Sequence, residues 1–460
     1  MLNQTSFQLF IWLHLLLTAP LAFADLRENT TENVSALLQE RGGAKAYSRL
    51  QQLSDHHSPR INGSTELEDA LDWARDLMAK DGLSNLQKQP VQVPHWIRGK
   101  ASAAILEPVS RTLDILALGG SPATPETGIE GEVIVFQTLD ALRLASREQV
   151  AGKIVLLNER MFTLGNHSAE QRYQRAVAAR IKGPALASTL GAKAALVRSI
   201  TTQSLGTLHT GMTRFDSTNA SPIPSASVTI EEAERLVRLT QEGPVKVHIN
   251  LQAEWLKDAI SHNVIGEIKG STYPDEIILV GAHMDTWDIG DGSMDNGCGC
   301  VMALEAVRLL NRLPFKPKRT IRIVLFTDEE HMQRGAEAYF KRFGHDHHVS
   351  AVETDLGCGA PQGYTVDGKR EDLEFLRSHL PSFSRFGVQE VQWGGSGANI
   401  APLVEGKGIV GIGVKPNMKT YFDRHHSAAD TFEKISADYL DQHSRGLALL
   451  LHLLSERDAQ

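Results

Sequence analysis

Cysteine is scarce in this sequence of 460 residues, and so are basic clusters and long apolar runs. The three cysteines, Cys298, Cys300 and Cys358, are too few and odd in number for a disulfide framework. We expect small buried side chains there, with a soft-metal site at Cys298 and Cys300 as the alternative. The net charge of −8 and the lack of a basic stripe argue against a nucleic-acid partner.

One apolar run near the start is the exception. It spans residues 9–17 and is followed by Ala22 and Ala24, the small residues of a signal-peptide cleavage site. No Lys or Arg precedes the run, so a membrane anchor is the alternative. The run is shorter than the ~20 apolar residues that a membrane-spanning helix needs. We therefore expect residues 1–24 to be a signal peptide and the mature protein to be secreted (extracellular or periplasmic), without stable membrane insertion.

The rest of the sequence divides into three regions. Residues 25–118 begin with two patterns of helical spacing, at 42–53 and 67–80. Residues 119–254 open with a turn cluster rich in Pro and Gly, which marks a boundary. Short apolar runs typical of strands follow, separated by turns and by one or two helices. No metal-ligating cluster occurs in this region, so we interpret it as an inserted, non-catalytic module.

Residues 255–460 show a regular alternation of strands and helices. Strands are expected at 263–268, 276–280, 320–326 and 409–414, and helices at 301–313 and 437–454. This alternation predicts a mixed α/β sheet that is covered by helices on both faces.

Acidic residues and histidines gather at the ends of the expected strands. His283 closes one strand and lies two residues before Asp285, so the two share one face of the strand end or its exit turn. The others are Asp295 in a glycine-rich loop, the run Asp328-Glu329-Glu330, Asp355, and His425-His426 with Asp430. Ligand and metal sites form at the carboxyl ends of strands in α/β sheets. The pattern indicates metal-assisted hydrolysis.

Each of these residues is weak evidence when taken alone, because a lone histidine after a strand is usually a core or surface residue. The ordered set is stronger, since it supplies one histidine and one carboxylate for each of two ions and a carboxylate to bridge them. The five expected ligands are His283, Asp295, Glu330, Asp355 and His426. Histidine and carboxylate ligands without thiolate suit zinc, with manganese or cobalt as substitutes.

Two further acids are expected to act beside the ligands. Asp285 is placed to accept the second ring N–H of His283 and so to fix its tautomer. Glu329 is the expected general base, taking a proton from the attacking water and passing it to the leaving amine. The sequence has no Gly-x-Ser-x-Gly elbow and no phosphate-binding lysine loop, so it offers no competing catalytic motif.

At these residues the sequence resembles the co-catalytic di-zinc exopeptidases of the aminopeptidase/glutamate carboxypeptidase family. The likeness rests on the pattern His-Met-Asp-Thr-Trp-Asp-Ile-Gly-Asp-Gly-Ser-Met-Asp that starts at His283, and on the motifs that contain Glu330, Asp355 and His426. It extends into the inserted region through the segment Gly-Gly-Ser-Pro-Ala-Thr-Pro at 119–125. It therefore spans nearly all of the mature chain.

The resemblance implies a three-layer α/β/α sandwich with a mixed central sheet. A β-rich protease-associated domain at 119–254 would be inserted between two parts of the catalytic domain, 25–118 and 255–460. The resemblance also implies two Zn²⁺ per chain that are bridged by Asp295. It further implies a peptide substrate and a homodimer. His426 is the implied ligand in place of His425, because the ligand of the family lies four residues before an aspartate.

The resemblance also implies the activity. It is the hydrolysis of dipeptides or short peptides with free termini, by glutamate-assisted attack of a metal-bridging water. His425 stands where many relatives have a tyrosine beside the tetrahedral intermediate, so we expect a catalytic donor there. Asn399 stands where relatives usually have aspartate and is expected to contact the substrate's terminus. An aminopeptidase on the same scaffold is the first alternative, and a non-catalytic, receptor-like homologue is the second.

Overall fold

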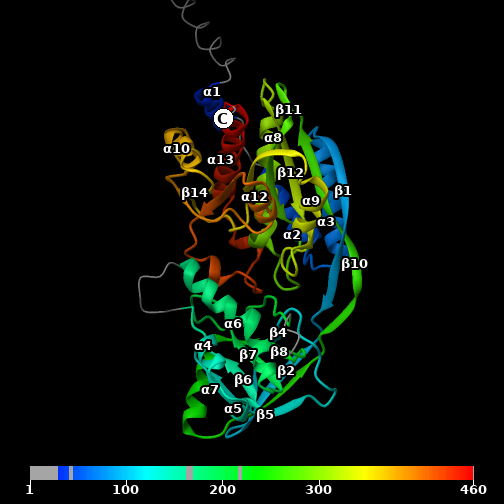
Figure 1. Cartoon of the computed structure of the whole chain (residues 1–460), viewed down its shortest axis with the longest axis vertical. Coiled ribbons are helices and arrows are strands. Elements are labelled where there is room, and N and C mark those ends of the chain that lie inside the picture. The colour runs from blue at the N-terminus through cyan, green and yellow to red at the C-terminus, as the bar shows by residue number, and fades with distance from the viewer. Residues whose placement is uncertain (1–29, 41–44, 162–168, 216–219, 459–460) are drawn as a thin grey trace, which may run out of the picture.

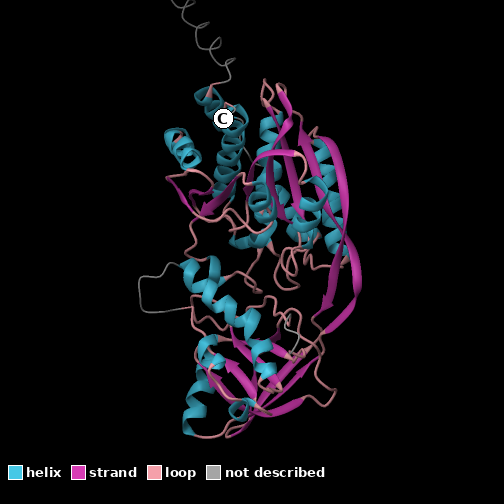
Figure 2. Ribbon diagram, in the orientation of Figure 1, coloured by secondary structure: helices cyan, strands magenta, loops and turns pink. Residues whose placement is uncertain are grey.

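The structure, a computed structural model, describes residues 30–40, 45–161, 169–215 and 220–458 (Figure 1). The expected signal peptide at 1–24 lies outside these residues. In the described part of the chain, no helix combines the length and the apolar character that crossing a membrane requires. The chain forms two mixed sheets of eight strands each, surrounded by helices and stacked along the long axis of the molecule (Figure 2).

One of the two sheets has the longer strands and is called the larger sheet. The candidate site lies at the ends of its strands. Its order is β1 (Ser84–Ile97), β10 (Glu254–Ile268), β12 (Arg319–Phe326), β11 (Tyr273–His283), β13 (His347–Glu353), β16 (Val410–Pro416), β14 (Pro361–Asp367) and β15 (Glu390–Trp393). The central strands β12, β11, β13 and β16 are parallel, whereas β10 and β14 run antiparallel to their central neighbours. The mixed sheet predicted from the alternation of strands and helices is confirmed.

Helices cover both faces of the larger sheet. One face packs against α2 (Lys45–His56), α3 (Thr65–Lys80), α8 (Cys298–Asn311) and α13 (Ala437–Glu456), and the other against α9 (Arg334–Phe343) and α12 (Ala401–Lys407). In β11, Ile278 and Val280 enter the first of these cores and Leu279 enters the second. The central strands are thus buried on both sides, which explains why they read as continuous apolar runs. The short helices α1 (Thr31–Glu40), α10 (Arg370–Ser378) and α11 (Leu380–Phe383) complete this unit.

The smaller sheet belongs to the inserted region. Its order is β3 (Arg111–Leu113), β2 (Ala101–Glu107), β9 (Lys246–Leu251), β5 (Ile129–Phe136), β6 (Ile154–Leu157), β7 (Ala194–Arg198), β8 (Ser225–Val228) and β4 (Ile115–Ala117). The helices are α4 (Leu139–Arg143), α5 (Arg147–Val150), α6 (Ala169–Thr189) and α7 (Ile230–Glu242). Strands β2, β3 and β4 precede residue 119, so the boundary expected there falls inside this unit.

Two long antiparallel strands connect the units. β1 and β10 leave the edge of the larger sheet and run on to the smaller unit, paired as far as Ile97 with Glu254 (Figure 1). The sequence patterns do not predict β1, which contains Pro90 and Pro94. Proline is tolerated there because β1 is an edge strand with a neighbour on one side only.

Helix α6 lies on the side of the smaller unit that faces the larger one (Figure 1). Ala176 of α6 is buried in the core of the larger unit, and Tyr173 and Val177 pack against that core. The face of α6 that carries these residues is therefore part of the contact between the two units.

Candidate active site

Three neighbouring parallel strands bring the first predicted site residues together. β11 ends at His283, and β12 and β13 lie on either side of it. Glu329 and Glu330 follow the end of β12, and Asp355 follows the end of β13. Because the carboxyl ends of parallel strands meet at one edge of a sheet, these four side chains converge there.

Asp295 reaches this edge from the loop between β11 and α8. Its backbone is not helical (φ −121°, ψ 92°), although the flanking turn is. The backbone N–H of Asp295 donates to Oδ2 of Asp430 at 3.0 Å, and the N–H of Met294 donates to Oδ1 at 2.7 Å. Asp430 therefore fixes the loop that presents Asp295.

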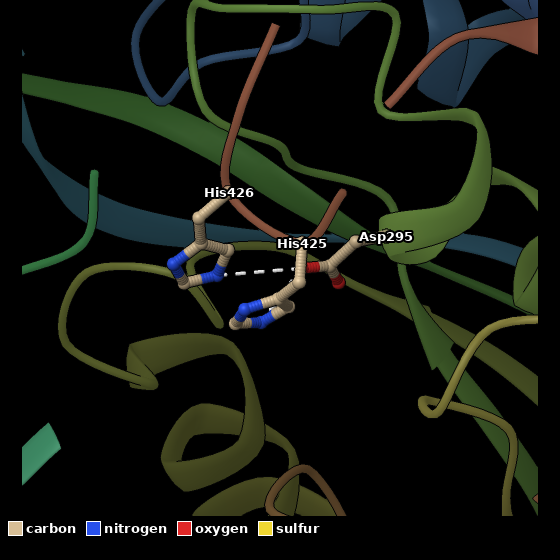
Figure 3. A group of neighbouring side chains, drawn as sticks. All are labelled: Asp295, His425 and His426. Atoms are coloured by element: carbon tan, nitrogen blue, oxygen red, sulfur yellow. Dashed lines mark ion pairs between the residues drawn. The ribbon is translucent and has the colours of Figure 1, made fainter. Parts of the chain in front are cut away.

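His425 and His426 lie in the loop that follows β16, the parallel neighbour of β13. Their rings stack with centroids 3.6 Å apart. Both imidazoles point toward the carboxylate of Asp295, with the Nε2 atoms of His425 and His426 at 3.2 and 3.3 Å from Oδ2 (Figure 3). The left-handed backbone of His426 (φ 58°) is a conformation that few non-glycine residues adopt.

The five expected ligands form two pairs with one carboxylate between them. Nε2 of His283 lies 2.9 Å from Oδ1 of Asp355 and 3.4 Å from Oδ1 of Asp295. Nε2 of His426 lies 3.0 Å from Oε2 of Glu330 and 3.3 Å from Oδ2 of Asp295. Each carboxylate oxygen of Asp295 thus faces a different pair, as a ligand shared by two cations would.

These residues fit cations by their chemistry and by their burial. Oδ2 of Asp295 is buried and accepts no hydrogen bond from the residues that the structure describes. One ligand atom from each of His283, Asp295 and Asp355 lies within 4.8 Å of the others, and the same holds for Asp295, His425 and His426. Buried carboxylates this close together are costly without positive charge between them. Oxygen and imidazole donors without thiolate match the preference of zinc.

The charges of the site shift its pKa values strongly. Burial opposes protonation of His283, but the carboxylate of Asp355, with Asp285 and Asp295, raises its pKa well above the usual value. Burial likewise opposes protonation of His426, whereas Glu330 and Asp295 raise its pKa to about 9. Burial raises the pKa of Glu329 well above its usual range. Binding of cations at the two imidazoles therefore releases protons.

Asp285 contacts His283 more closely through its main chain than through its side chain. Nδ1 of His283 lies 3.0 Å from the backbone oxygen of Asp285 and 3.7 Å from its carboxylate. The carboxylate instead accepts the backbone N–H groups of Glu329 and Glu330, both at 3.1 Å. Asp285 therefore orients the histidine through its main chain and the acidic loop through its side chain.

Trp287 is a site residue whose role the sequence does not indicate. Its Nε1 donates to Oε2 of Glu330 at 2.6 Å. The indole is buried and packs against His331, with centroids 4.7 Å apart, and against His426 at 5.9 Å. Its position in the motif that starts at His283 could have indicated that Trp287 belongs to the site. Only the fold shows that the acid it contacts is Glu330.

The inserted unit also reaches the site. Thr210 donates its backbone N–H to the oxygen of His426 at 2.8 Å, and its own oxygen lies 3.3 Å from Nδ1 of His426. Nδ1 of His209 lies 2.7 Å from the backbone oxygen of His425. A hydrogen bond from Nδ1 of His426 to Thr210 leaves Nε2 free to bind a cation.

His425 and Asn399 have surroundings that the sequence did not indicate. His425 packs between Tyr173 and Tyr421, with centroids at 5.4 and 4.9 Å. Asn399 is buried and donates its backbone N–H and its Nδ2 to Oε1 of Glu353, at 3.2 and 2.9 Å. The roles expected for the two residues, an oxyanion donor and a substrate contact, stay predictions.

Known proteins resemble this chain in sequence. Peptidase family M28 matches residues 263–451. Carboxypeptidase Q of Bos taurus is 34% identical over 390 residues, which cover 84% of this chain and 80% of the relative. Carboxypeptidase Q of Xenopus laevis is 35% identical over 392 residues, which cover 84% of this chain and 81% of the relative.

Solved structures resemble it in fold. A peptidase M28 precursor from Shewanella amazonensis superposes with a TM-score of 0.88 at 30% identity, covering 94% of this chain and 97% of the other. A zinc aminopeptidase from Bacillus subtilis superposes with a TM-score of 0.64 at 21% identity, covering 90% of this chain and 95% of the other. At that identity the second likeness concerns the fold alone.

Proposed function

Because this chain belongs to peptidase family M28 and is a zinc metallo-exopeptidase, we propose that it hydrolyses dipeptides and short peptides with free termini, in the manner of carboxypeptidase Q. One observation carries the proposal. The pairs His283–Asp355 and His426–Glu330, in which His283 and Glu330 are buried and Asp355 and His426 are half-buried, lie on either side of Asp295, each facing one oxygen of its carboxylate.

We assign two zinc ions to these pairs. His283 and Asp355 would hold one ion, His426 and Glu330 the other, and Asp295 would bridge them. When bound, the ions would polarise the scissile carbonyl and lower the pKa of the attacking water. The hydrogen-bond partners of the ligand side chains, which are Thr210, Trp287 and the backbone oxygen of Asp285, support this assignment because such contacts fix ligand orientation.

Glu329 is the proposed proton carrier. It would accept a proton from the water that attacks the carbonyl carbon, and deliver that proton to the nitrogen of the leaving amine as the C–N bond breaks. Asp285 holds the backbone N–H of Glu329, which supports a fixed position for this side chain. His425 is a proposed donor to the oxyanion from the other side of Asp295.

An aminopeptidase is the second candidate, favoured by the fold that this chain shares with the zinc aminopeptidase of Bacillus subtilis. The two activities differ in which substrate terminus must be free. A receptor-like protein without activity is the third candidate. It is disfavoured because such a protein has no need for three acids, two of them buried, around two imidazoles.

One experiment separates the three candidates. The purified mature chain is incubated with a free dipeptide, an amino-acetylated dipeptide and a carboxy-amidated dipeptide, with and without a chelator, while zinc per chain is measured. We expect cleavage of the free dipeptide, loss of that cleavage with chelator and its return with added zinc. Cleavage of the amidated but not the acetylated peptide would identify an aminopeptidase. A chain that binds less than one ion and cleaves nothing would be a scaffold.

Three further expectations complete the proposal. We infer that the smaller unit is a protease-associated domain, and we revise its start from residue 119 to about 101, where its sheet begins. We also propose export after removal of residues 1–24, and a homodimer. The mass of the secreted protein, measured by light scattering and by mass spectrometry, tests both.

A further inference from the structure

Arg180 of helix α6 is a buried cation that has no charged partner among the described residues. Its side chain is only 6% exposed. Nη1 donates to the backbone oxygen of Thr210 at 2.9 Å, and Nε is buried without a hydrogen bond. Among the residues that the structure describes, no carboxylate lies within ion-pairing distance of it. Burying an arginine in this way is unfavourable unless an anion joins it in some functional state.

The guanidinium lies beside the active site. The oxygen of Thr210 that it contacts is the one that faces Nδ1 of His426, so a single carbonyl separates Arg180 from an expected zinc ligand. After burial and the neighbouring His426, Arg180 is among the groups that lower the pKa of His425. Tyr173, seven residues earlier on the same face of α6, packs against the ring of His425.

Gly211 allows the guanidinium of Arg180 to lie against the main chain. A Cβ atom built on Gly211 would lie 2.1 Å from both Cζ and Nη1 of Arg180, and Gly211 has φ +133°. Only glycine, which adopts this backbone conformation without strain, allows the guanidinium to lie against the chain there. The position of Arg180 is therefore determined by the segment that also contacts His426.

We propose that Arg180 binds the free carboxylate on the leaving-group side of the peptide substrate. The inference rests on the proposed function. In a dipeptide the terminal carboxylate carbon lies less than about 4 Å from the scissile carbonyl carbon, given standard bond lengths, so its partner must stand next to the metal ligands. The amino terminus is excluded from this place because it is a cation. The planar guanidinium matches a carboxylate with two parallel hydrogen bonds.

Arg180→Met tests the proposal with three substrates: Ala-Leu, Ala-Leu amide and Ala-Glu amide. For Ala-Leu we expect kcat/KM to fall roughly 30- to 1,000-fold, the loss that follows removal of one partner of a buried charge pair. Both amides lack the terminal carboxylate and should be poor substrates of the wild type. Their low kcat/KM should change by less than about threefold in the variant, within the spread of neutral substitutions. Calorimetry should show the same selectivity without turnover: leucine binding is lost and leucine amide binding is kept. Zinc per chain should stay unchanged.

Arg175→Met is the matched control. Arg175 lies on the same helix, but its side chain is 53% exposed and pairs with Glu159. It should leave all three substrates unaffected. Arg180→Lys keeps the cation and loses the planar fork, so it should retain part of the preference for Ala-Leu that Arg180→Met loses. It replaces Arg180→Met as the test variant if that protein is unstable.

The outcomes distinguish this inference from the proposed function. If the zinc-loaded wild type cleaves none of the peptides, the proposed function fails. An equal loss on Ala-Leu and Ala-Leu amide together with a loss of zinc would overturn the carboxylate assignment, since Arg180 would then act by holding Thr210 against His426. A loss confined to Ala-Glu amide would likewise overturn it in favour of a side-chain carboxylate.

Discussion

The carboxylate of Asp285 accepts the backbone N–H of Glu330 at 3.1 Å, and its other oxygen accepts that of Glu329 at the same distance. One acid at the end of β11 thus holds the main chain of the two acids that follow β12. Burial raises the pKa of Asp285, but His283 and the two N–H groups lower it by more than burial raises it. The pKa of Asp285 is therefore below its usual value. The side chain stays ionised, as its role as a double acceptor requires.

Asp285→Asn should therefore weaken both zinc affinity and turnover. The amide can accept one of the two hydrogen bonds but places its NH₂ group against the other N–H, which leaves a buried donor unpaired. We expect a loss of roughly 10- to 100-fold in zinc affinity or in kcat/KM, as for other residues that orient metal ligands. Zinc titration with a competing chelator and steady-state kinetics measure the two quantities.

Asp275→Asn is the control for this variant, because Asp275 is exposed on the same strand β11. It should match the wild type in both measurements. Wild-type zinc affinity and kcat/KM in Asp285→Asn would show that the loop of Glu329 and Glu330 needs no support from this side chain.

Glu329→Gln should abolish proton transfer and leave the metal in place. Glutamine has nearly the same shape and cannot accept a proton, so kcat should fall roughly 10²- to 10⁴-fold. Zinc per chain, measured by elemental analysis, should equal that of the wild type. The matched control Glu337→Gln lies on the exposed side of α9 and should have full activity. Activity within threefold of the wild type would remove Glu329 from the mechanism.

The convergence of the five expected ligands could be predicted from the sequence because each one lies in a loop that follows a strand of the same sheet. The motif that starts at His283 identified two of these residues, His283 and Asp295. The others were expected nearby because parallel strands place their carboxyl ends together. The structure agrees in bringing His283 to Asp355 and His426 to Glu330. The central strands were readable for the same reason, since burial on both faces produces continuous apolar runs.

Other contacts could not be predicted, because spacing along the chain does not determine them. A separation of two residues places His283 and Asp285 on one face but does not say whether the ring contacts a carboxylate or a backbone oxygen. Thr210 and His426 are 216 residues apart, and only the packing of the inserted unit joins them. Strand β1 was missed because its prolines disfavour a strand wherever the edge position is unknown.

Trp287→Phe should weaken zinc binding at the Glu330 side of the site. Phenylalanine retains a ring in the cavity but cannot donate the hydrogen bond that Trp287 makes to Glu330 at 2.6 Å. We expect a loss of roughly 10- to 100-fold in affinity for one of the two ions, as when other partners of metal ligands are removed. Calorimetric zinc titration should resolve the weakened step from the unchanged one.

Trp255→Phe provides the comparison, because Trp255 is 42% exposed on β10 and donates only to the backbone oxygen of Gly120 at 3.3 Å. Its two zinc-binding steps should be those of the wild type. Equal weakening of both steps in Trp287→Phe would mean that the indole supports the site by packing and not through Glu330.

His443 should make the protein less stable in mild acid. It is buried in α13, and its Nε2 lies 2.8 Å from the backbone oxygen of Gly359. Burial lowers its pKa from 6.5 to about 4, with the Gly359 carbonyl acting in the opposite direction. Between these two values the unfolded chain binds a proton that the folded chain does not. The free energy of unfolding therefore rises with pH through this window, and it is lost as the pH falls.

His443→Gln tests this sign, because glutamine keeps the N–H donor and cannot titrate. Urea unfolding of both proteins at pH 7 and pH 5 should give a smaller loss of stability for the variant, by about 2 kcal/mol for a shift of this size. Contributions from other histidines and from the metal site are common to both proteins and cancel in the comparison. His345→Gln, at a side chain that is 78% exposed, should lose as much stability as the wild type. If His443→Gln does so too, the buried imidazole is already protonated at pH 5, and the assignment of a neutral core histidine fails.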